Sequence, residues 1–282
     1  MSDPYRIQGP ALISFSGGRT SAYMLHEIIR TWGGTLPDDV VVTFANTGKE
    51  MPQTLDFVYE CGERWDVPIV WLEYCDHDDT KRRWRHVNFS TASRFGEPFF
   101  ALMNRKGYLP NPVTRFCTSE LKVLPMRDFA QAQGWEHWTN VIGLRADEPR
   151  RVARSRHNRE PWDNAMPLAT AGVTKRDVQA FWMRQNFDLR LPNINGTTPA
   201  GNCDMCFLKS AATIQGIMRD QPGLADWWIE AEAEARASKP SGALFRQDRP
   251  SYAAMLDAVK RQQVFDFGDA DRLDDCYCTG DA

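Results

Sequence analysis

The chain has no long hydrophobic run and no large excess of charge of either sign. No apolar stretch in its 282 residues approaches the roughly 18 residues that a membrane-spanning helix needs. The N-terminus lacks the apolar core of a signal peptide, so we expect a cytoplasmic protein without membrane contact. A formal net charge of -3 argues against a protein that coats nucleic acid, although it is compatible with a local basic groove.

The chain also lacks internal repeats and low-complexity segments. A hydrophobic content of 42% and a charged content of 25% are typical of a globular protein. Its length accommodates one large α/β domain with an appendage, or two small domains. In a reducing compartment, its 7 cysteines are expected to be thiols, metal ligands or redox groups rather than structural disulfides.

The most informative segment is Ser-Phe-Ser-Gly-Gly-Arg-Thr-Ser at positions 14–21. It follows the apolar residues 11–13 and leads into a helical pattern, so it predicts a strand, a glycine turn and a helix. Two glycines allow a tight turn with inward-pointing N–H groups, and the helix start adds the positive end of its dipole. Hydroxyl groups and the Arg19 charge complete a predicted phosphate-binding loop. The segment fits neither a Walker loop nor the dinucleotide Gly-x-Gly-x-x-Gly; an ordinary βα turn is the alternative.

Strand and helix patterns alternate through the first half of the chain. This order predicts a parallel sheet covered on both faces, with a ligand at the carboxyl ends of the strands, where the glycine turn lies. The predicted strands are 11–13, 39–46, 68–74 and 138–144. The predicted helices are one from about residue 21, then 52–65, 121–133, 174–186, 208–219 and 224–237.

Three parts are expected along the chain. Residues 1–160 form an α/β nucleotide-binding domain, interrupted by an irregular, basic and aromatic insertion at 76–115. Residues 161–265 form a helical region that completes the site. Residues 266–282 form an acidic tail that contains two cysteines.

A second polar segment lies at the end of the predicted strand 39–46. Phe44 and Asn46 end this strand, and Thr47, Gly48 and Glu50 follow directly. With the glycine loop before it, this segment resembles the phosphoadenosine phosphosulfate (PAPS) reductase family, within the PP-loop superfamily of N-type ATP pyrophosphatases. The resemblance implies a doubly wound, Rossmann-like sheet of the HUP type with a helical C-terminal region. It also implies that the end of the second strand contacts the adenine and the ribose.

Residues 115–126 are similar to a further element of this family, of the form Cys-x-x-x-x-Lys-x-x-Pro. Cys117 and Lys122 occupy its cysteine and lysine positions. Thr118 stands where relatives often carry a second cysteine. The resemblance makes Lys122 a candidate catalytic residue.

Two later segments resemble the family in the same order. Residues 143–151 match a Gly-[Ile/Leu]-Arg-x-x-Glu segment, which includes Gly143 and Arg145. Arg145 is suited to hold an anionic group through two hydrogen bonds, which a lysine does less well. Residues 166–189 match a Pro-Leu and helix block.

The Cys-x-x-Cys pair of Cys203 and Cys206 predicts a metal or iron–sulfur half-site, because two thiolates at this spacing can reach one metal centre. Free redox thiols and a zinc site are the alternatives. In adenylyl-sulfate reductases of the family, such a pair and an earlier cysteine pair hold a [4Fe–4S] cluster beside the nucleotide. The resemblance therefore implies Cys117, Cys203 and Cys206 as ligands. Either Cys276 or Cys278 is the fourth, or one iron stays open.

The tail differs from that of PAPS reductases, which carry a reactive cysteine in a Glu-Cys-Gly-[Ile/Leu]-His motif. Here Cys276 and Cys278 stand in Asp-Asp-Cys-Tyr-Cys-Thr-Gly, without a histidine. Cys276 is the predicted fourth ligand and Cys278 the candidate nucleophile, although the flanking acids would raise the pKa of a thiol. Cys61 and Cys75 are expected to be ordinary buried cysteines.

Two basic runs remain, 81–86 and 150–159, of which only residues 150 and 151 belong to one of these motifs. Such runs usually form solvated faces, but beside a nucleotide site they can hold phosphates or guide a nucleic-acid strand. The second run directly follows the Arg145 segment, so it is the better candidate for a functional role.

Three functions are compatible with these features. An ATP-using enzyme would cleave ATP between its α and β phosphates and couple adenylation to iron–sulfur-assisted sulfur transfer; the intact loop favours this one. A PAPS or adenylyl-sulfate reductase would release sulfite through a tail cysteine. A non-catalytic partner would sense a nucleotide or accompany a nucleic acid.

The predicted site comprises three groups of residues. The catalytic candidates are Arg19, Lys122, Arg145 and Cys278. The nucleotide-binding candidates are Ser14, Ser16, Gly17, Gly18, Arg19, Thr20, Ser21, Phe44, Asn46, Thr47, Gly48, Glu50, Gly143 and Arg145. The metal-ligand candidates are Cys117, Cys203, Cys206 and Cys276.

The resemblance also implies cofactors and partners. The cofactors are ATP (or PAPS or adenylyl sulfate), Mg²⁺ and a [4Fe–4S] cluster. The partners are a sulfur donor or a thioredoxin-like reductant, while a nucleic-acid substrate and a homodimer are left open.

Overall fold

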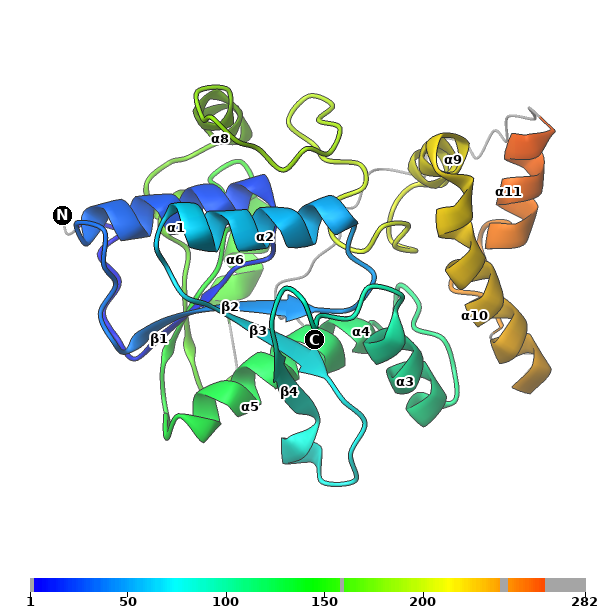
Figure 1. Cartoon of the computed structure of the whole chain (residues 1–282), viewed down its shortest axis with the longest axis horizontal. Helices are drawn as coiled ribbons and strands as arrows, with labels where there is room; N and C mark the ends of the chain where they lie inside the picture. Colours follow the sequence, from blue (N-terminus) through cyan, green and yellow to red (C-terminus); the bar gives the residue numbers. More distant parts are fainter. Residues whose placement is uncertain (1–2, 158–159, 239–242, 262–282) are drawn as a thin grey trace.

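A six-stranded sheet forms the centre of the molecule (Figure 1). The structure is a computed structural model, and it describes residues 3–157, 160–238 and 243–261. The strand order is β4-β3-β2-β1-β5-β6, and every neighbouring pair is parallel except β3 and β4. The strands are β1 (Ala11–Ser14), β2 (Val40–Asn46), β3 (Ile69–Tyr74), β4 (Trp84–Val87), β5 (Thr139–Val141) and β6 (Asp163–Ala165).

The central strands are apolar on both sides because helices cover both faces of the sheet. Within β1, Ala11 and Ile13 pack into the larger hydrophobic core, whereas Leu12 belongs to a separate core with Phe129 and Trp138. This alternation follows from the two-residue period of a strand. The two cores are the two faces of the sheet, so the predicted doubly wound architecture is confirmed.

Helices α1 (Arg19–Thr31) and α2 (Pro52–Arg64) lie on one side of the sheet, and α5 (Leu124–Ala132) lies on the other (Figure 1). Helix α8 (Lys175–Trp182) packs on the outside of α1. The other helices in the first two thirds of the chain are η1 (Thr80–Arg82), α3 (Glu97–Lys106), α4 (Phe116–Thr118), η2 (Ser119–Val123), α6 (Pro149–Arg156) and α7 (Pro167–Thr170).

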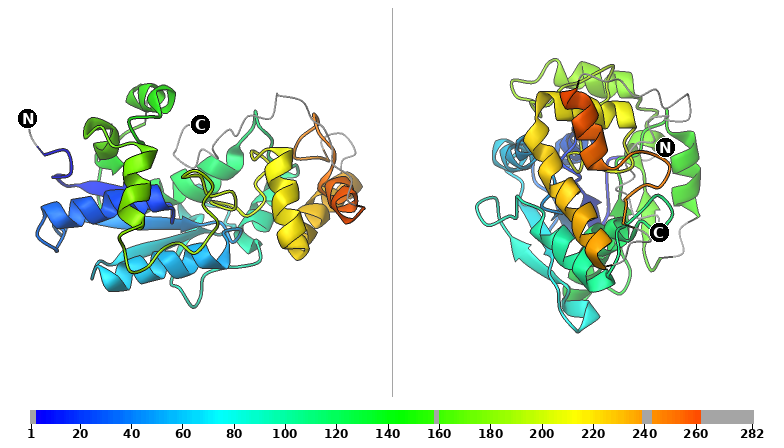
Figure 2. Two further views of the ribbon diagram at one scale, coloured as in Figure 1. Left: turned by 90° about the horizontal axis from the view of Figure 1, so that it is seen from above. Right: turned by 90° about the vertical axis from the view of Figure 1, so that its right-hand side faces the viewer.

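The last helices gather at one end of the molecule, the end toward which β2 points (Figures 1 and 2). They are α9 (Ala211–Asp220), η3 (Pro222–Leu224), α10 (Ala225–Ser238) and α11 (Tyr252–Lys260). Aromatic rings hold them together: Trp228 stacks on Tyr252, with ring centroids 5.2 Å apart, and packs against Phe245 at 5.0 Å. The predicted helical C-terminal region is therefore present at the carboxyl end of β2.

The structure differs from the sequence-based expectation at three places. The insertion 76–115 contains β4 and α3; β4 is a polar edge strand, so it lacks the apolar signal of the central strands. The helix expected at 121–133 begins at Phe116 and passes through a π-helical turn, η2. The sheet also continues beyond residue 160, because β6 pairs with β5.

Cys61 is fully buried in α2, and desolvation raises the pKa of its thiol, as expected for a structural cysteine. Cys75 is only half-buried, so the expectation of burial was wrong for this residue. No helix in the described ranges combines the length and apolar character required to cross a bilayer.

Candidate functional site

The loop between β1 and α1 has the geometry of a phosphate-binding turn. Gly17 has φ +73°, a conformation that favours glycine, and a Cβ atom there would lie 2.7 Å from Thr54 Cγ2 of α2. Only glycine therefore fits between the turn and α2. Gly18 is the residue before the first turn of α1, whose leading N–H groups have no partner within the helix.

Hydroxyl groups surround the start of α1. Ser16 Oγ lies 2.9 Å from Ser21 Oγ, which also donates to Gly18 O. The chain after β5 approaches closely, since a Cβ atom on Gly143 would lie 3.3 Å from Ser21 Cα. Free N–H groups, hydroxyls and a glycine-permitted close approach together form a pocket suited to an anion.

A cavity of about 210 Å³ opens over this turn. Its walls come from residues 14–21, from Gly143 to Arg151, from the start of α8 and from the segment 189–202. This volume suits the phosphate chain of a nucleotide better than a whole drug-sized ligand. Ser14 also lines a second cavity of about 30 Å³, which is large enough for a water molecule but too small for a purine ring.

Arg19 joins the loop to the far wall of the cavity. Its Nε and Nη2 donate to the two carboxylate oxygens of Asp188 at 2.7 and 2.5 Å, and further bonds reach Thr198 Oγ1 and Leu191 O. Its side chain is 9% exposed, against 39% for Asp188. The sequence predicts that Arg19 supplies a fixed positive charge for phosphates, and in the structure its guanidinium holds the segment 189–202 over the loop.

Arg145, a candidate for binding the nucleotide, faces the loop. Its Nη1 donates to Thr20 Oγ1 (3.1 Å) and its Nε to Asp147 Oδ1 (2.9 Å). Glu148 accepts from the Arg145 backbone N–H (3.0 Å) and forms an ion pair with Arg151. Both arginines line the cavity, so two oriented guanidinium groups stand beside the turn, each with a carboxylate partner.

Lys175 is a cavity residue that sequence reasoning missed. Its Nζ donates to Thr197 Oγ1 (3.3 Å), and its backbone N–H donates to Asp147 Oδ2. Of the cations that line the cavity within the described ranges, Lys175 is the one without a carboxylate partner. The capping box of α8, in which Thr174 and Asp177 pair, located the helix start but gave no sign that the next residue faces a cavity.

The polar residues at the end of β2 and directly after it form a buried structural network instead of lining the cavity. Asn46 donates from Nδ2 to Glu73 Oε1 (2.6 Å) and Ser93 O (2.8 Å), so its amide is already satisfied. The Glu50 carboxylate accepts from the backbone N–H and the hydroxyl of Thr47, at 2.9 Å each. Together with these residues, Phe44 and Gly48 are absent from the walls of the cavity. The predicted nucleotide-binding set is thus divided between two places.

The Cys-x-x-Cys loop lies against this buried network. Cys203 pairs with Glu50 through a β-bridge, and its Sγ lies 3.6 Å from Thr47 Oγ1. Lys122, buried in the π-helical turn, has its Nζ 3.6 Å from Glu50 Oε1. Lys122 therefore lies beside Glu50, and it lines the small cavity with Ser14 but not the cavity over the glycine turn.

A metal site is not preassembled in the described part of the chain. Cys203 and Cys206 are buried and Cys117 is half-buried. The described residues contain no group of three or more His, Cys, Asp or Glu side chains that could hold a metal ion. Cys276 and Cys278 lie outside the described residues. The predicted [4Fe–4S] cluster thus stays a prediction that rests on the sequence.

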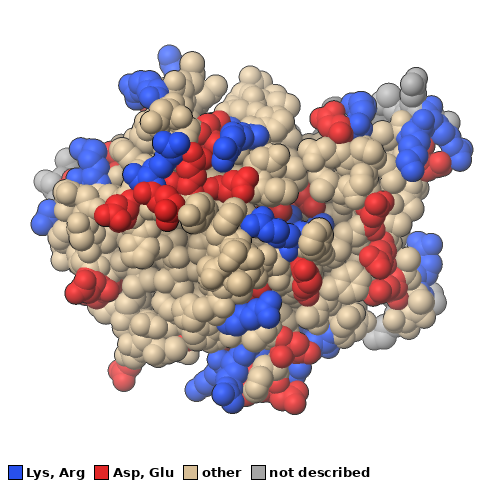
Figure 3. Space-filling model, viewed as in Figure 1, with Lys and Arg blue, Asp and Glu red and all other residues tan. Residues whose placement is uncertain are grey.

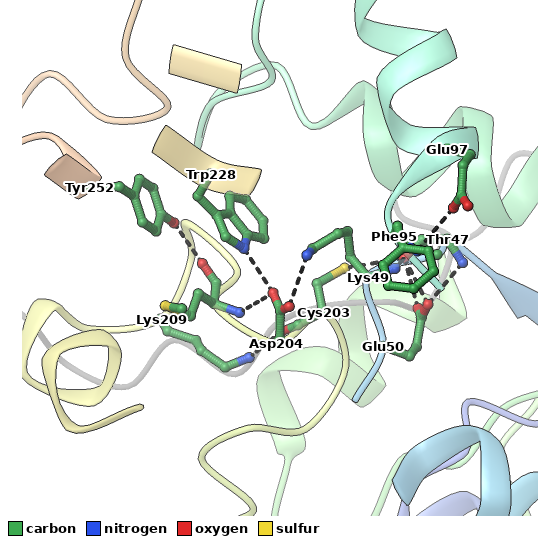
Figure 4. A network of polar contacts seen from close by, with 12 residues as sticks. Thr47, Lys49, Glu50, Phe95, Glu97, Cys203, Asp204, Lys209, Trp228 and Tyr252 are labelled. Carbon is green, nitrogen blue, oxygen red and sulfur yellow. Dashed lines mark hydrogen bonds and ion pairs between the residues drawn. The ribbon is translucent and has the colours of Figure 1, made fainter. Parts of the chain in front are cut away.

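A buried ion pair fixes the cysteine loop in position (Figure 4). Lys49 Nζ lies 3.0 Å from Asp204 Oδ2, with side chains 7% and 4% exposed. Asp204 also accepts from Trp228 Nε1 (2.8 Å) and from the Met205 backbone N–H (2.6 Å). The Asp204 backbone N–H donates to Lys49 O at 2.7 Å. One side chain therefore links the turn after β2, the cysteine loop and α10.

Comparison with known proteins finds two relatives. The chain is 33% identical over 222 residues to the uncharacterized nin region protein ORF290 of Escherichia phage lambda, which covers 76% of this chain and 71% of that protein. It is 22% identical over 228 residues to the uncharacterized protein MJ0066 of Methanocaldococcus jannaschii. That match covers 79% of this chain and 41% of the archaeal protein, so the chain spans about two fifths of its length. No family model matches the chain.

Asp188→Asn is expected to loosen the wall of the cavity, because it leaves the Arg19 guanidinium short of its negative partner. Since Asp188 is partly exposed, we expect a loss of about 2 kcal/mol in the free energy of unfolding, below the full cost of breaking a buried pair. Urea unfolding measures this loss, and limited proteolysis should cut the segment 189–202 faster. Arg190→Gln, which breaks only an exposed pair with Glu60, is the control. An equal loss of unfolding free energy in Asp188→Asn and Arg190→Gln would show that the pair of Arg19 and Asp188 does not hold the wall of the cavity.

Asp204→Asn should lower the unfolding free energy by about 3 kcal/mol, more than Asp188→Asn, because it leaves the buried Lys49 ammonium group without its carboxylate partner. The double variant Lys49→Met with Asp204→Asn removes both charges. Its loss of unfolding free energy should be smaller, by at least about 1 kcal/mol, than the losses of Lys49→Met and Asp204→Asn added together. Asp257→Asn breaks an exposed pair with Arg261 and serves as the control, with a change within about 0.5 kcal/mol. If the loss in the double variant equals the sum of the two single losses, the two charges do not stabilise each other.

Proposed function

The chain belongs to the family of the uncharacterized nin region protein ORF290 of Escherichia phage lambda, and we propose that it is an ATP-cleaving enzyme of the PP-loop type. In this proposal, the turn between β1 and α1 binds the phosphates of ATP. The reaction breaks the bond between the α and β phosphates and transfers the adenylyl group to an acceptor. The PAPS reductase-like sequence elements and the cysteine loop then suggest a later sulfur-transfer step in a reducing cytoplasm.

The observation that carries the proposal is the cavity over the glycine turn. It brings together unpaired N–H groups at a helix start, the Ser16 and Ser21 hydroxyls, Arg145 and Lys175. Each of these groups donates hydrogen bonds, and a polyphosphate offers only acceptors. A sheet of this topology also binds its ligands at the carboxyl ends of its strands, where this cavity lies.

The chemistry expected of this chain is electrostatic stabilisation. An acceptor oxygen forms a new bond to the α-phosphorus, the bond to the bridging oxygen breaks, and pyrophosphate leaves with the negative charge. Donors fixed beforehand around the turn stabilise that charge without rearranging. Lys175 is the lining cation without a carboxylate partner in the described ranges, so it is the natural counterion of the leaving pyrophosphate.

Mg²⁺ would accompany the nucleotide and further neutralise the phosphates. The Glu148 carboxylate already accepts from Arg145 and pairs with Arg151, so the ion would be held mainly by phosphate oxygens and water, as Mg²⁺ commonly is. No step is assigned to an iron–sulfur cluster, because the described cysteines do not form a complete ligand set.

Lys175→Gln tests the phosphate site. Loss of one charge-assisted hydrogen bond should weaken ATP and pyrophosphate binding about tenfold and slow pyrophosphate release. Calorimetry measures the binding, and labelled ATP measures the release. Arg176→Gln is the matched control, since it removes one exposed positive charge from the next position of α8.

Equal binding by the two variants would remove Lys175 from the site. Wild-type protein that binds ATP without releasing pyrophosphate would support a nucleotide sensor instead. Thioredoxin-dependent release of sulfite from PAPS would instead support the alternative function of a PAPS reductase.

The iron–sulfur prediction is tested by metal content. Protein purified without oxygen should be brown and contain iron and acid-labile sulfide. Cys203→Ser and Cys206→Ser should each lose the iron, while Cys75→Ser, which alters a half-buried thiol elsewhere, should retain it. Circular dichroism checks that each variant is folded. A colourless protein with zinc, or with no metal, would refute the cluster.

A further inference from the structure

Helix α6 carries an uncompensated basic surface. Its eight residues, Pro-Arg-Arg-Val-Ala-Arg-Ser-Arg, include four arginines and no acid. Arg150, Arg154 and Arg156 are exposed and have no carboxylate partner among the described residues. Arg150 and Arg154 are four positions apart, so they lie on the same side of the helix.

In the other basic run of the chain, two arginines are held by contacts within the protein. Residues 81–85 lie close to Asp76, Asp78 and Asp79 in the chain, and positive and negative side chains mix over this segment at the lower edge of the molecule in Figure 3. Arg85 pairs with the buried Glu73, and Arg83 donates to a backbone carbonyl. These contacts give two arginines of that run a role in the fold.

Helix α6 also begins at the cavity. Glu148, directly before the helix, and Arg151 in its first turn both line the cavity over the glycine turn. The remaining arginines of α6 extend the positive charge from the wall of this cavity along the outside of the molecule. A chain of phosphates bound to α6 would therefore reach the cavity.

The surface lacks the features of a membrane or protein contact. Val152, the one large apolar residue of α6, is buried in a small core with Ile142 and Leu144. An interfacial membrane helix needs an apolar face to insert, and a protein interface needs an apolar or aromatic centre. Exposed arginines without apolar neighbours instead match the repeated charges of a nucleic-acid backbone.

We propose that α6 binds the phosphate backbone of single-stranded nucleic acid and leads the strand to the cavity. An eight-residue helix is only about 12 Å long, so it spans a few phosphates of one strand and less than the contact surface of a duplex-binding protein. The interaction is electrostatic and independent of base sequence. It does not depend on ATP cleavage.

The test compares two variants with equal loss of charge. The first is Arg150→Gln with Arg154→Gln and Arg156→Gln; the second is Lys81→Gln with Arg82→Gln and Arg83→Gln. Fluorescence anisotropy measures binding of a labelled single strand of about 20 nucleotides, between about 50 and 200 mM salt. None of the six residues lines the cavity. Thermal melting checks that both variants are folded.

The α6 variant should bind the strand about tenfold more weakly at low salt, and its slope of log affinity against log salt should fall by about 2, because about 0.7 is lost per phosphate contact. The control variant should bind like the wild type. The proposal is overturned if the two variants lose affinity alike, if neither does, or if the wild type binds no strand. It is also overturned if a duplex or an anionic vesicle binds more tightly through α6.

The same proteins separate this inference from the proposed function. Both variants should retain ATP binding and pyrophosphate release, because their changes lie outside the cavity walls. Strand binding through α6 without pyrophosphate release would refute ATP cleavage alone. Pyrophosphate release without strand binding would refute the α6 surface alone.

Discussion

The buried pair of Lys49 and Asp204 is the constraint on which the second half of the structure depends. Two charges withdrawn from water must satisfy each other, so the turn after β2 and the cysteine loop cannot separate without exposing or stranding one of them. Trp228 donates to the same carboxylate, and Trp228 stacks on Tyr252. The position of Cys203 beside Glu50 and Thr47 is therefore coupled to the packing of α10 and α11.

Arg19 performs the equivalent task at the other side of the site. It comes from the first turn of α1, yet its guanidinium bonds Asp188, Leu191 and Thr198, about 170 residues further along the chain. These bonds hold the segment that covers the glycine turn. Both connections use a cation from the N-terminal half and a carboxylate from the C-terminal half. The C-terminal half is thus joined to the N-terminal half through buried or partly buried charge pairs, in addition to its hydrophobic contacts.

Several positive side chains line the cavity, and most of them are paired with carboxylates of the protein. Arg19, Arg145 and Arg151 each have a carboxylate partner, which fixes their orientation and lowers the net charge that a ligand meets. Donors fixed in this way suit a ligand whose charge develops during a reaction, because they need no rearrangement. Lys175 supplies charge without such a partner among the described residues, while α6 extends it outside the cavity. The cavity and α6 therefore form one positive region, to which we assign two proposed ligands that both carry phosphates: ATP and single-stranded nucleic acid.

The sequence by itself determined the four central strands of the sheet, the glycine turn and the helix that follows it, because strand periodicity, turn residues and helix starts are local properties of the chain. It also singled out Arg145, which lies at this turn, as a candidate for holding an anionic group. It could not show that Arg19 pairs with Asp188, that Asn46 donates a hydrogen bond to Glu73, or that Lys175 faces the cavity. Polar side chains of one type bind ligands or stabilise folds according to their neighbours, and those neighbours come from distant parts of the chain. Only the tertiary structure decided which charges are used within the protein and which remain for a ligand.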